Sequence, residues 1–487
     1  MRDLLLGLDL GTTSLKAGAF DAGGRRLWSF AAPVTTHRGP GGRAEQDPGE
    51  WLALLRGALG DLAGAGLAGC VAAVGLTSQV NTHAFVDNEG RALAPAILWQ
   101  DTRAAPDAAL LDATLSEAER VAWWGAPMGV DASHALARMA WARREKPDLW
   151  AATRAVLLPK DLLALALTGN LASDPLSSIG LAGADGRYPD ALLARVPGAA
   201  GKLPPLRPMT TVAGEAALAP GLSTVPVAVG VMDAWASFLG VGMRANGDAA
   251  WLSGTSEVLG MASRDGPGAP GILVFPEAEG LRVHAGPTQA GGDALAWACA
   301  LLDTSPEQLE AEVAAAGPSL RAPLFLPHLG GERAPLWDPG ARGAFLGLDA
   351  GMGRAALGRA VYEGVALSAR LALEAVEASA GRRAEVLLCG GGGFRSDLWA
   401  QVRADAVGRP LRRLAVSDAG VVGAAALGAV AAGLAPSLPA ALARLATHDR
   451  TFEPDPDGTR RMDELFALFR PAYEALRATS RALAARP

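Results

Sequence analysis

The alternation of apolar runs with short polar turns predicts that the chain begins with a β-hairpin. An apolar strand from Leu5 to Leu10 leads into the hydroxyl-rich turn Gly11–Ser14, and a second strand follows over Leu15–Phe20. Backbone N–H groups, threonine hydroxyls and the ammonium of Lys16 are donors that suit phosphate oxygens. Asp9 stands near the end of the first strand, where a carboxylate can hold a hydrated Mg²⁺ ion. An ordinary hairpin is the alternative, because the spacing of a P-loop is absent.

A second segment repeats this pattern in the other half of the chain. The apolar run Ala249–Leu252 is followed by Ser253-Gly254-Thr255-Ser256 and by a further apolar strand. Two hairpins of one design predict a duplicated domain in which each half supplies one phosphate-binding tip. This arrangement resembles the actin, hexokinase and sugar kinase architecture, although two short turns can also coincide by chance.

Two strand-to-helix junctions carry the remaining candidate chemistry. The buried-type strand Val225–Val231 ends at Met232-Asp233-Ala234, and a small-residue helix is expected from Trp235 to Val241. The strand Glu385–Cys389 runs into Gly390–Gly393 and then into a helix over Asp397–Val407. Glycines in such a place let the backbone approach a ligand and aim a helix N-terminus at it, although four glycines can also form a linker.

The polar pattern also predicts helix starts and a domain boundary. Asp47 can cap a helix whose first residue is Pro48, with Glu50 completing a capping box. Residues 183–221 are rich in Pro and Gly and are expected to connect elements at the surface. The boundary is expected at about 241–246, which gives an N-terminal domain over 1–243 and a C-terminal domain over 244–487.

Composition narrows the class of protein. A chain of 487 residues is too long for a single hydrophobic core and suits two domains. Its content of 50% hydrophobic and 19% charged residues is typical of a folded enzyme. A net charge of −6 argues against nucleic acid as a partner. Three widely spaced cysteines indicate neither a disulfide framework nor a zinc site, which fits a reducing cytoplasm. No secretory signal is evident, and the uncharged stretch Ala419–Ala443 is broken by Gly433 and Pro436, which favours a buried helix over a membrane span.

In their order along the chain these segments resemble the FGGY family of carbohydrate kinases, and most closely its xylulokinase branch. The resemblance covers nearly the whole sequence, and eight motifs in the family's order are a specific signal. The motifs are Asp9–Lys16, Glu45–Pro48 with Trp51, Ala96–Arg103, Leu157–Asp161, Val229–Asp233, Leu252–Ser256, Phe325–Pro335 and Gly390–Gly393. The family implies an α/β fold of two ribonuclease H-like domains, of actin, hexokinase and sugar kinase type, with a catalytic cleft between the domains.

The resemblance implies ATP-dependent phosphorylation of a small sugar, with a pentulose such as xylulose as the first expectation. Asp233 is then the catalytic base, although an aspartate at this junction can also be a helix cap, and Asp9 orients Mg²⁺. Whether Lys16 contacts phosphate or only the solvent is left open. Contacts to ATP are expected from Gly11, Thr12, Thr13, Lys16, Gly254, Thr255, Gly291, Gly292, Gly391, Gly392 and Gly393. Contacts to the sugar are expected from Val80, Asn81, Trp99, Asp101 and Asp233.

The sequence departs from the xylulokinase pattern at the expected sugar site. Gln79-Val80-Asn81-Thr82 stands where the family usually carries Gln-Met-His-Gly, and Ala234 follows the catalytic aspartate in place of Asn. Arg138 stands where the family tends to have Lys. A missing histidine and a missing amide remove hydrogen-bond partners for sugar hydroxyls, so the reaction type is expected to hold while the sugar is open.

Three alternatives remain at this level. Within the family, the acceptor could be ribulose, a tetritol or pentitol, or glycerol. An actin-like or Hsp70-like ATPase would use the same two hairpins to drive a conformational cycle on a protein partner. A sugar-binding regulator derived from a kinase should lack the base, whereas Asp233 is present. The expected partners are a small sugar or polyol, with neither nucleic acid nor membrane, and a homodimer is left open.

Overall fold

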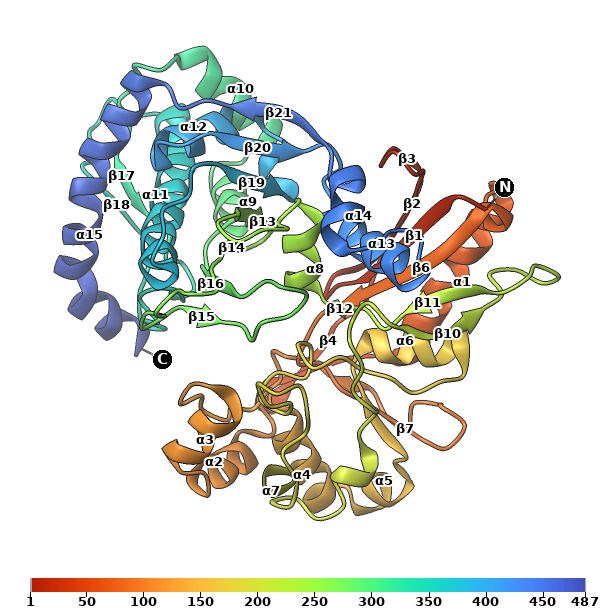
Figure 1. The fold of residues 1–487 in the computed structure, drawn as a ribbon. Helices are drawn as coiled ribbons and strands as arrows, with labels where there is room; N and C mark the ends of the chain where they lie inside the picture. The colour runs from red at the N-terminus through yellow and green to blue at the C-terminus, as the bar shows by residue number, and fades with distance from the viewer. Residues whose placement is uncertain (1, 487) are drawn as a thin grey trace. The chain divides into compact units, whose positions relative to one another are not determined.

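A computed structural model of the chain describes residues 2–486, which divide into two compact units (Figure 1). Unit 1 comprises the chain up to Gly240 together with Gly420–Ala446, and unit 2 comprises Val241–Ala419 and the chain from Thr447 onward. The first crossing lies close to the expected boundary at 243/244. The segment 420–446, expected in the C-terminal domain, belongs to unit 1 in the structure.

Unit 1 is built on a seven-stranded sheet with the order β10-β11-β6-β1-β2-β3, and β12 pairs with β6 beside β11. The strands β1 and β6 run parallel, whereas β1 and β2 form the antiparallel hairpin that the sequence predicts. The strands are β1 (Leu4–Leu10), β2 (Ser14–Phe20), β3 (Arg26–Pro33), β6 (Val71–Ser78), β10 (Val212–Ala216), β11 (Val225–Ala228) and β12 (Val231–Met232).

Helices cover both faces of this sheet. Leu6 and Leu8 point to the face where α1 packs, and the alternation of a strand places Gly7 and Asp9 on the opposite face with α13. The covering helices are α1 (Pro48–Gly64), α6 (Pro159–Thr168), α8 (Asp233–Gly240), α13 (Ala419–Ala431) and α14 (Leu438–Leu445). Figure 1 shows α13 and α14, from late in the chain, beside β1 and β6 from its beginning.

Two glycines explain why the late segment joins unit 1. A Cβ atom on Gly75 would lie 1.6 Å from the Ala424 carbonyl oxygen, and one on Gly7 would lie 2.0 Å from that of Val421. The backbone of α13 therefore rests directly on β1 and β6, at a distance that any side chain on these strand positions would prevent. The first part of the uncharged stretch forms the buried helix α13, as the sequence predicts, whereas its remainder leads into the separate helix α14.

The rest of unit 1 is a smaller layer with its own core. It contains two short sheets, β4-β5-β8 and β7-β9. Alternate residues of β7 and β9 belong to the two cores, since Ala84 and Leu157 pack in the main core whereas Phe85 and Val156 pack in the smaller one. Its strands are β4 (His37–Gly39), β5 (Arg43–Gln46), β7 (Ala84–Val86), β8 (Ala96–Ile97) and β9 (Ala155–Leu157). Its helices are α2 (Ala105–Ala113), α3 (Glu117–Trp124), α4 (Ala135–Glu145), α5 (Pro147–Ala152) and α7 (Asp190–Leu193).

Unit 2 repeats the plan of unit 1. Its sheet has the order β15-β16-β14-β13-β19-β20-β21, and β13 pairs antiparallel with β14 and parallel with β19. The strands are β13 (Ala249–Ser253), β14 (Glu257–Ala262), β15 (Leu273–Val274), β16 (Val283–Pro287), β19 (Leu387–Gly390), β20 (Leu411–Leu414) and β21 (His448–Phe452). A separate pair consists of β17 (Leu324–Leu326) and β18 (Ala344–Leu346). The α/β class with two related sheet-bearing units is confirmed.

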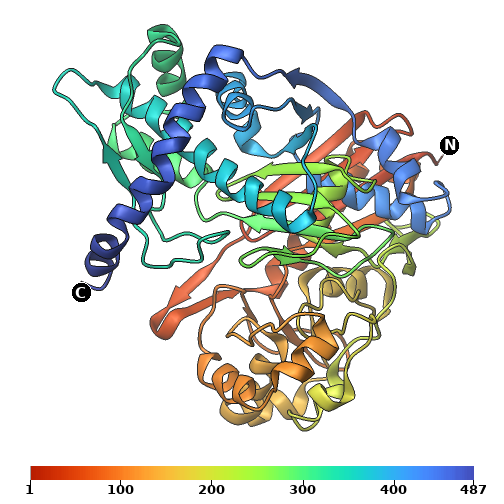
Figure 2. The ribbon, with the colours of Figure 1, turned by 60° about the vertical axis from the view of Figure 1, so that its left-hand side comes forward.

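Five α-helices complete unit 2 within the described residues. The long C-terminal helix α15, the dark blue helix in Figure 2, packs against α12 and α11. The helices are α9 (Gly292–Leu301), α10 (Pro306–Ala316), α11 (Arg354–Ala380), α12 (Asp397–Val407) and α15 (Pro456–Ala484). Among residues 2–486, no helix has both the length and the apolar character that crossing a membrane demands. The three cysteines are free.

Three local predictions need correction. Asp47 caps α1 by accepting from the Gly49 N–H group, but Glu50 does not close a capping box, because its carboxylate accepts from Thr35 instead. The predicted strand Val225–Val231 is two strands, since Gly230 interrupts it at a φ of 76°. Residues 183–221 are not all surface connection, because β10 forms the edge of the main sheet.

Candidate active site

The carboxyl ends of three parallel strands bring two aspartates to one edge of the sheet in unit 1. Asp9 of β1 is in register with Thr77 of β6, and Thr77 is in register with Val231 of β12. Asp233 follows β12 directly and is the first residue of α8. Because neighbouring strands lie about 4.8 Å apart, Asp9 and Val231 are separated by roughly two strand spacings across the sheet, and Asp233 lies two residues beyond Val231. The sequence-predicted base and metal ligand therefore share an edge of the sheet.

Asp9 lies beneath the first turn of α13. A Cβ atom on Gly420 would lie 2.5 Å from Asp9 Oδ2 and 3.5 Å from the Ser237 hydroxyl oxygen of α8. Glycine at position 420 thus keeps open the space beside the carboxylate. Among residues 2–486 no cluster of three or more His, Cys, Asp or Glu side chains could hold a metal. One carboxylate in an open cradle fits a Mg²⁺ ion that keeps its waters and takes its other ligands from phosphates.

The environment of Asp233 suits a proton acceptor. Its Oδ1 accepts a hydrogen bond of 2.8 Å from the Ala234 N–H group at the start of α8. Burial of the carboxylate raises the pKa of Asp233 to about 6, although that hydrogen bond acts in the opposite direction. A carboxyl group with such a pKa is ionised at neutral pH and is still a useful base. The position at the helix start is compatible with catalysis, so the two roles considered for Asp233 do not exclude each other.

The first hairpin tip has the compact turn that the sequence predicts. Gly11 donates its N–H group to the Ser14 carbonyl oxygen at 3.0 Å, and the side chain of Thr13 is exposed. Thr12 lies inward and donates its hydroxyl to the Gln79 side chain at 3.0 Å. Lys16 is in register with Asp9 on the adjacent strand, which places both side chains on the same face of the sheet.

A buried amide network beneath this tip was missed by sequence reasoning. The Gln46 amide donates to the Thr12 carbonyl oxygen at 2.7 Å, and the Gln79 amide donates to Gln46 Oε1 at 2.9 Å. Trp51 donates its indole N–H to the same Gln46 oxygen at 3.0 Å. Gln46 and Gln79 are both buried, and they fix the backbone of the tip. The motif containing Gln46 was visible in the sequence, but no local pattern shows which atoms it binds.

Apart from Asp233 at the start of α8, the residues expected to contact sugar lie on two neighbouring loops of unit 1. Asn81 adopts a left-handed backbone conformation with a φ of 51° and donates its amide to the Ser133 hydroxyl at 3.2 Å. Trp99 keeps 43% of its surface exposed and donates its indole N–H to the Thr12 hydroxyl at 3.1 Å. Trp99 is thus hydrogen-bonded to the first hairpin tip. Val80 precedes Asn81 on the other loop.

Asp101 has little capacity left for a ligand. Its two carboxylate oxygens accept from the guanidinium of Arg103 at 2.6 and 2.9 Å and from the Ala44 N–H group at 2.7 Å. Burial acts to raise the pKa of Asp101, but the bonds from Arg103 and Ala44 outweigh it and lower this pKa. The sugar contact expected of Asp101 stays a prediction, and this geometry favours an orienting role.

Arg138 of α4 holds both sugar-site loops from behind. Its buried guanidinium donates to the carbonyl oxygens of Asn81 and Leu98, and to that of Ile97 at 2.9 Å. It also lies 2.8 Å from His83 Nδ1. Burial lowers the pKa of Arg138 to about 9, and burial together with Arg138 lowers that of His83, so the imidazole is neutral and its Nδ1 accepts. A guanidinium can make these bonds simultaneously, whereas an ammonium cannot.

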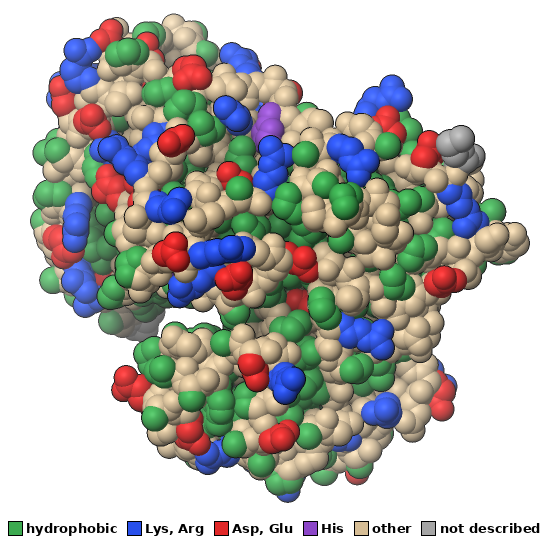
Figure 3. Space-filling view, viewed as in Figure 1, with side chains coloured by type: hydrophobic (Ala, Val, Ile, Leu, Met, Phe, Trp, Pro, Cys, Tyr) green, Lys and Arg blue, Asp and Glu red, His purple; other side chains and the backbone are tan. Residues whose placement is uncertain are grey.

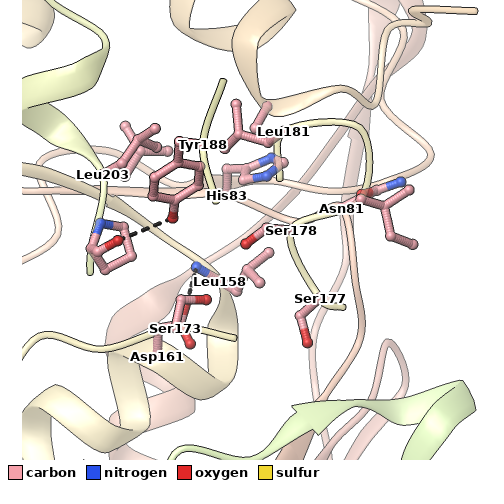
Figure 4. Close-up of a pocket in the computed structure, with 14 residues that line it drawn as sticks. Asn81, His83, Leu158, Asp161, Ser173, Ser177, Ser178, Leu181, Tyr188 and Leu203 are labelled. Atoms are coloured by element: carbon pink, nitrogen blue, oxygen red, sulfur yellow. Dashed lines mark hydrogen bonds between the residues drawn. The ribbon is translucent and has the colours of Figure 1, made fainter. Parts of the chain in front are cut away.

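A small pocket borders Asn81 in unit 1 (Figure 4). It is also lined by His83, Ser177 and Tyr188, whose hydroxyl donates to the Pro204 carbonyl oxygen at 3.0 Å. Its volume of about 20 Å³ holds a single water molecule. The pocket is therefore a polar gap in the packing and too small to be the acceptor site.

In unit 2 the second hairpin tip is joined to the start of α9. The N–H group of Gly292 donates to the Gly254 carbonyl oxygen at 2.9 Å, and that of Asp293 donates to the Thr255 carbonyl oxygen at 3.1 Å. A Cβ atom on Gly291 would lie 2.8 Å from backbone atoms of Ser256. The two glycines predicted to face nucleotide thus allow the helix start to pack on the hairpin backbone.

The glycine-rich loop Gly391–Gly393 begins where β19 ends. The strands β19 and β13 end at the same edge of the unit 2 sheet, because Leu252 and Gly390 are in register. A Cβ atom on Gly391 would lie 2.2 Å from the Ser253 carbonyl oxygen, and one on Gly393 would lie 2.1 Å from the Ser253 hydroxyl oxygen. Nothing lies within 4 Å of a Cβ position on Gly392. Of these three glycines, Gly392 faces open space, and the other two let the loop approach the hairpin.

Arg333 is a charged group at the second tip that sequence reasoning assigned no role. Its guanidinium donates to the Ser256 hydroxyl at 3.1 Å and to the Thr288 carbonyl oxygen at 2.5 Å. Burial lowers the pKa of Arg333, and the nearby carboxylate of Glu332 counteracts this.

On the face of the molecule in Figure 3, acidic and basic side chains are intermixed, and this face shows no broad basic surface.

Comparison with known proteins shows the family to which the chain belongs. Models of the FGGY family of carbohydrate kinases match the chain, with the N-terminal domain over residues 4–240 and the C-terminal domain over residues 249–432. The xylulose kinase of Escherichia coli K12 is 32% identical over 97% of this chain and 98% of its own. That of Streptomyces coelicolor is 34% identical over 87% of both chains. The solved structure of a xyloylose kinase from Brucella ovis superimposes with a TM-score of 0.86 at 32% identity, covering 98% of this chain and all of that one.

Two α/β units of one plan, each with a hydroxyl-rich hairpin tip, together with these relatives define an ATP-dependent sugar kinase. More particularly, the chain belongs to the FGGY family of carbohydrate kinases.

Proposed function

We propose that this kinase transfers the γ-phosphoryl group of ATP to a hydroxyl of a pentulose such as xylulose, with Asp233 as the general base. The observation that carries the proposal is the half-buried carboxylate of Asp233 at the carboxyl edge of the sheet, with a pKa of about 6. The named function of the relatives, xylulose kinase, supports the choice of acceptor.

Phosphoryl transfer needs alignment and charge neutralisation more than covalent chemistry by the protein. Asp233 would accept the proton of the attacking hydroxyl as its oxygen bonds to the γ-phosphorus and the bond from that phosphorus to the β-phosphate oxygen breaks, which releases ADP. Mg²⁺, held through Asp9, would supply neutralising charge to the phosphates when it is bound. The groups proposed to contact ATP are Gly11, Thr12, Thr13, Lys16, Gly254, Thr255, Gly291, Gly292, Gly391, Gly392 and Gly393. Those proposed to contact the sugar are Val80, Asn81, Trp99, Asp101 and Asp233.

A second acceptor class is favoured by one specific feature. The Asn81 amide already bonds to Ser133, and Ala234 offers no side-chain hydrogen bond to a sugar. A site that lacks a partner for a given hydroxyl discriminates poorly in favour of sugars that carry it. A related ketose or polyol, such as ribulose, a tetritol, a pentitol or glycerol, is therefore the alternative acceptor.

A substrate panel separates these possibilities. We expect ATP consumption to depend on added sugar, and the alternative acceptor class further predicts that D-xylulose is a poorer substrate than another ketose or polyol. The double variant Asn81→His with Ala234→Asn should then shift the preference towards D-xylulose. If wild type turns over D-xylulose with kcat/KM near ~10⁵ M⁻¹s⁻¹ or better, within the usual range for enzymes, the expectation of a different preferred acceptor is wrong. ATP turnover that no sugar accelerates would favour the ATPase alternative.

The raised pKa of Asp233 predicts a specific pH dependence. A base works only when ionised, so the rate of phosphoryl transfer should fall about tenfold per pH unit below the pKa near 6 and level off above pH 7. The measurement is kcat at saturating ATP and sugar between pH 5 and 8. A rate that stays constant down to pH 5 would show that another group accepts the proton.

A further inference from the structure

Unit 2 contains a fully buried ion pair, Glu257 and Arg403, that has no role in the proposed function. Glu257 is the first residue of β14 and Arg403 lies in the middle of α12, and both side chains are 0% exposed. The Arg403 guanidinium donates to Glu257 Oε1 at 2.5 Å. A buried ion pair is weak support for stability, because removing two charges from water costs about as much as their attraction returns.

The pair is connected to the second hairpin tip. Ser253 and Glu257 are the last paired residues before the turn, and the Ser253 hydroxyl donates to Glu257 Oε1 at 2.7 Å. Arg403 donates to that same hydroxyl oxygen at 2.9 Å. Trp251 donates its indole N–H to the other oxygen of Glu257 at 3.0 Å. One carboxylate thus bridges the two strands that flank the turn containing Gly254 and Thr255.

The same guanidinium reaches the glycine-rich loop. Arg403 donates through its other terminal nitrogen to the Gly393 carbonyl oxygen at 2.5 Å. Ser253 lies so close to this loop that a Cβ atom on Gly393 would come within 2.1 Å of its hydroxyl oxygen. One planar group therefore bonds to both elements proposed to bind nucleotide, and its fixed geometry relates them to each other.

Three aromatic rings enclose the guanidinium and keep water away. The central carbon of the Arg403 guanidinium lies 4.0 Å from the ring centre of Trp399, 4.5 Å from that of Phe394 and 5.4 Å from that of Trp251. Burial lowers the pKa of Arg403 and raises that of Glu257, and the charge of each partner opposes the shift of the other. In such a dry site the bonds are strong and directional.

We propose that Glu257 and Arg403 are positioning residues for the nucleotide, holding the tip at Gly254–Ser256 and the loop at Gly391–Gly393 in the arrangement that ATP requires. The inference rests on the proposed assignment of these two segments to ATP. It adds a determinant of nucleotide affinity that neither touches the ligand nor belongs to either segment.

The decisive variant removes both charges at once. Glu257→Gln with Arg403→Met keeps an acceptor for Trp251 and an unbranched chain among the rings, and it leaves no buried charge unpaired. We expect a folded enzyme in which the Kd for ADP and the KM for ATP rise at least tenfold while the KM for sugar stays within twofold. The Kd is measured by calorimetric titration of the full chain with ADP, and folding is checked by the melting temperature.

A matched pair elsewhere in unit 2 provides the control. Arg409 and Glu377 form an ion pair with an N–O distance of 3.2 Å, and their side chains are 11% and 12% exposed. Neither bonds to the hairpin tip or to the glycine-rich loop. Glu377→Gln with Arg409→Met should therefore leave the Kd for ADP unchanged, even if it lowers the melting temperature.

Arg403→Lys is the second variant and decides the question if the double variant does not fold. It keeps a positive charge for Glu257 but cannot bond to Ser253 and Gly393 at the same time, so weaker ADP binding is expected. A folded variant of either kind that binds ADP within twofold of wild type would overturn the proposal. Because ADP binding needs no acceptor, a wild type that binds ADP but phosphorylates no sugar would refute only the proposed function. A wild type that binds no ADP would overturn both.

Discussion

Asp233→Asn is expected to lower kcat for sugar phosphorylation by ~10²–10⁴-fold, the usual contribution of a general base, while ADP binds as to wild type. The amide is nearly isosteric but cannot accept the proton of the attacking hydroxyl at neutral pH. The measurement combines steady-state kinetics on the preferred sugar with titration of ADP. A variant that keeps more than a tenth of wild-type turnover would show that Asp233 serves only as the start of α8.

Stability distinguishes this result from unfolding. The pKa of Asp233 in the fold, about 6, is above its ordinary value of 3.8, so the folded state binds this proton more tightly than the unfolded chain. The stability that protonation provides is complete below pH 3.8 and is lost as the pH rises through 6. At pH 7 the amide removes the cost of burying an anion, and the variant should melt no lower than wild type. Asp47→Asn, at the cap of α1, is the control that should change neither activity nor stability appreciably.

The sequence predicts what depends on neighbours along the chain. The hairpin at Leu5–Phe20, the start of α1 at Pro48 and the helix Asp397–Val407 follow from periodicity, capping residues and turn residues, and the structure has all three, with the first strand beginning one residue earlier at Leu4. The return of 420–446 to unit 1 could not be predicted in this way. It depends on the absence of side chains at Gly7 and Gly75, and no local pattern relates these strand positions to a helix much later in the chain.

In the candidate site, too, the features set by neighbouring residues could be predicted, whereas those set by remote contacts could not. Short motifs placed Asp9, Asp233 and the two tips at strand ends, because strand and turn patterns are local. The partners that fix these tips are remote in sequence, as Gln46 is from Gln79 and Arg403 is from Glu257. The glycine motif alone does not show which of its residues has room for a ligand. Gly391 and Gly393 lie against Ser253 of the hairpin, and of the three glycines only Gly392 faces open space.

Lys160→Met is expected to lower the free energy of unfolding by about 3–5 kcal/mol, the cost of leaving buried charge without its partner. The Lys160 ammonium lies 2.6 Å from Asp161 and 2.9 Å from Asp174, and all three side chains are at most 1% exposed. Burial acts to lower the pKa of Lys160, but the charges of the two aspartates outweigh it and raise this pKa. Methionine fills the space yet leaves two carboxylates facing each other. The midpoint of urea unfolding at pH 7 measures the effect, and Lys146→Met, at an exposed lysine, should change it by less than about 0.5 kcal/mol.

The position of Lys160 ties this loss of stability to the catalytic edge of unit 1. Its backbone N–H group donates to the Ser78 hydroxyl at the end of β6, and its ammonium lies 3.5 Å from the Val229 carbonyl oxygen, just before the strand that leads into Asp233. Replacing Asp161 and Asp174 by Asn in the Lys160→Met background removes the unpaired charges and should restore part of the stability. If Lys160→Met alone unfolds within about 1 kcal/mol of wild type, the carboxylates have found protons or water, and the ion cluster is not what holds this edge together.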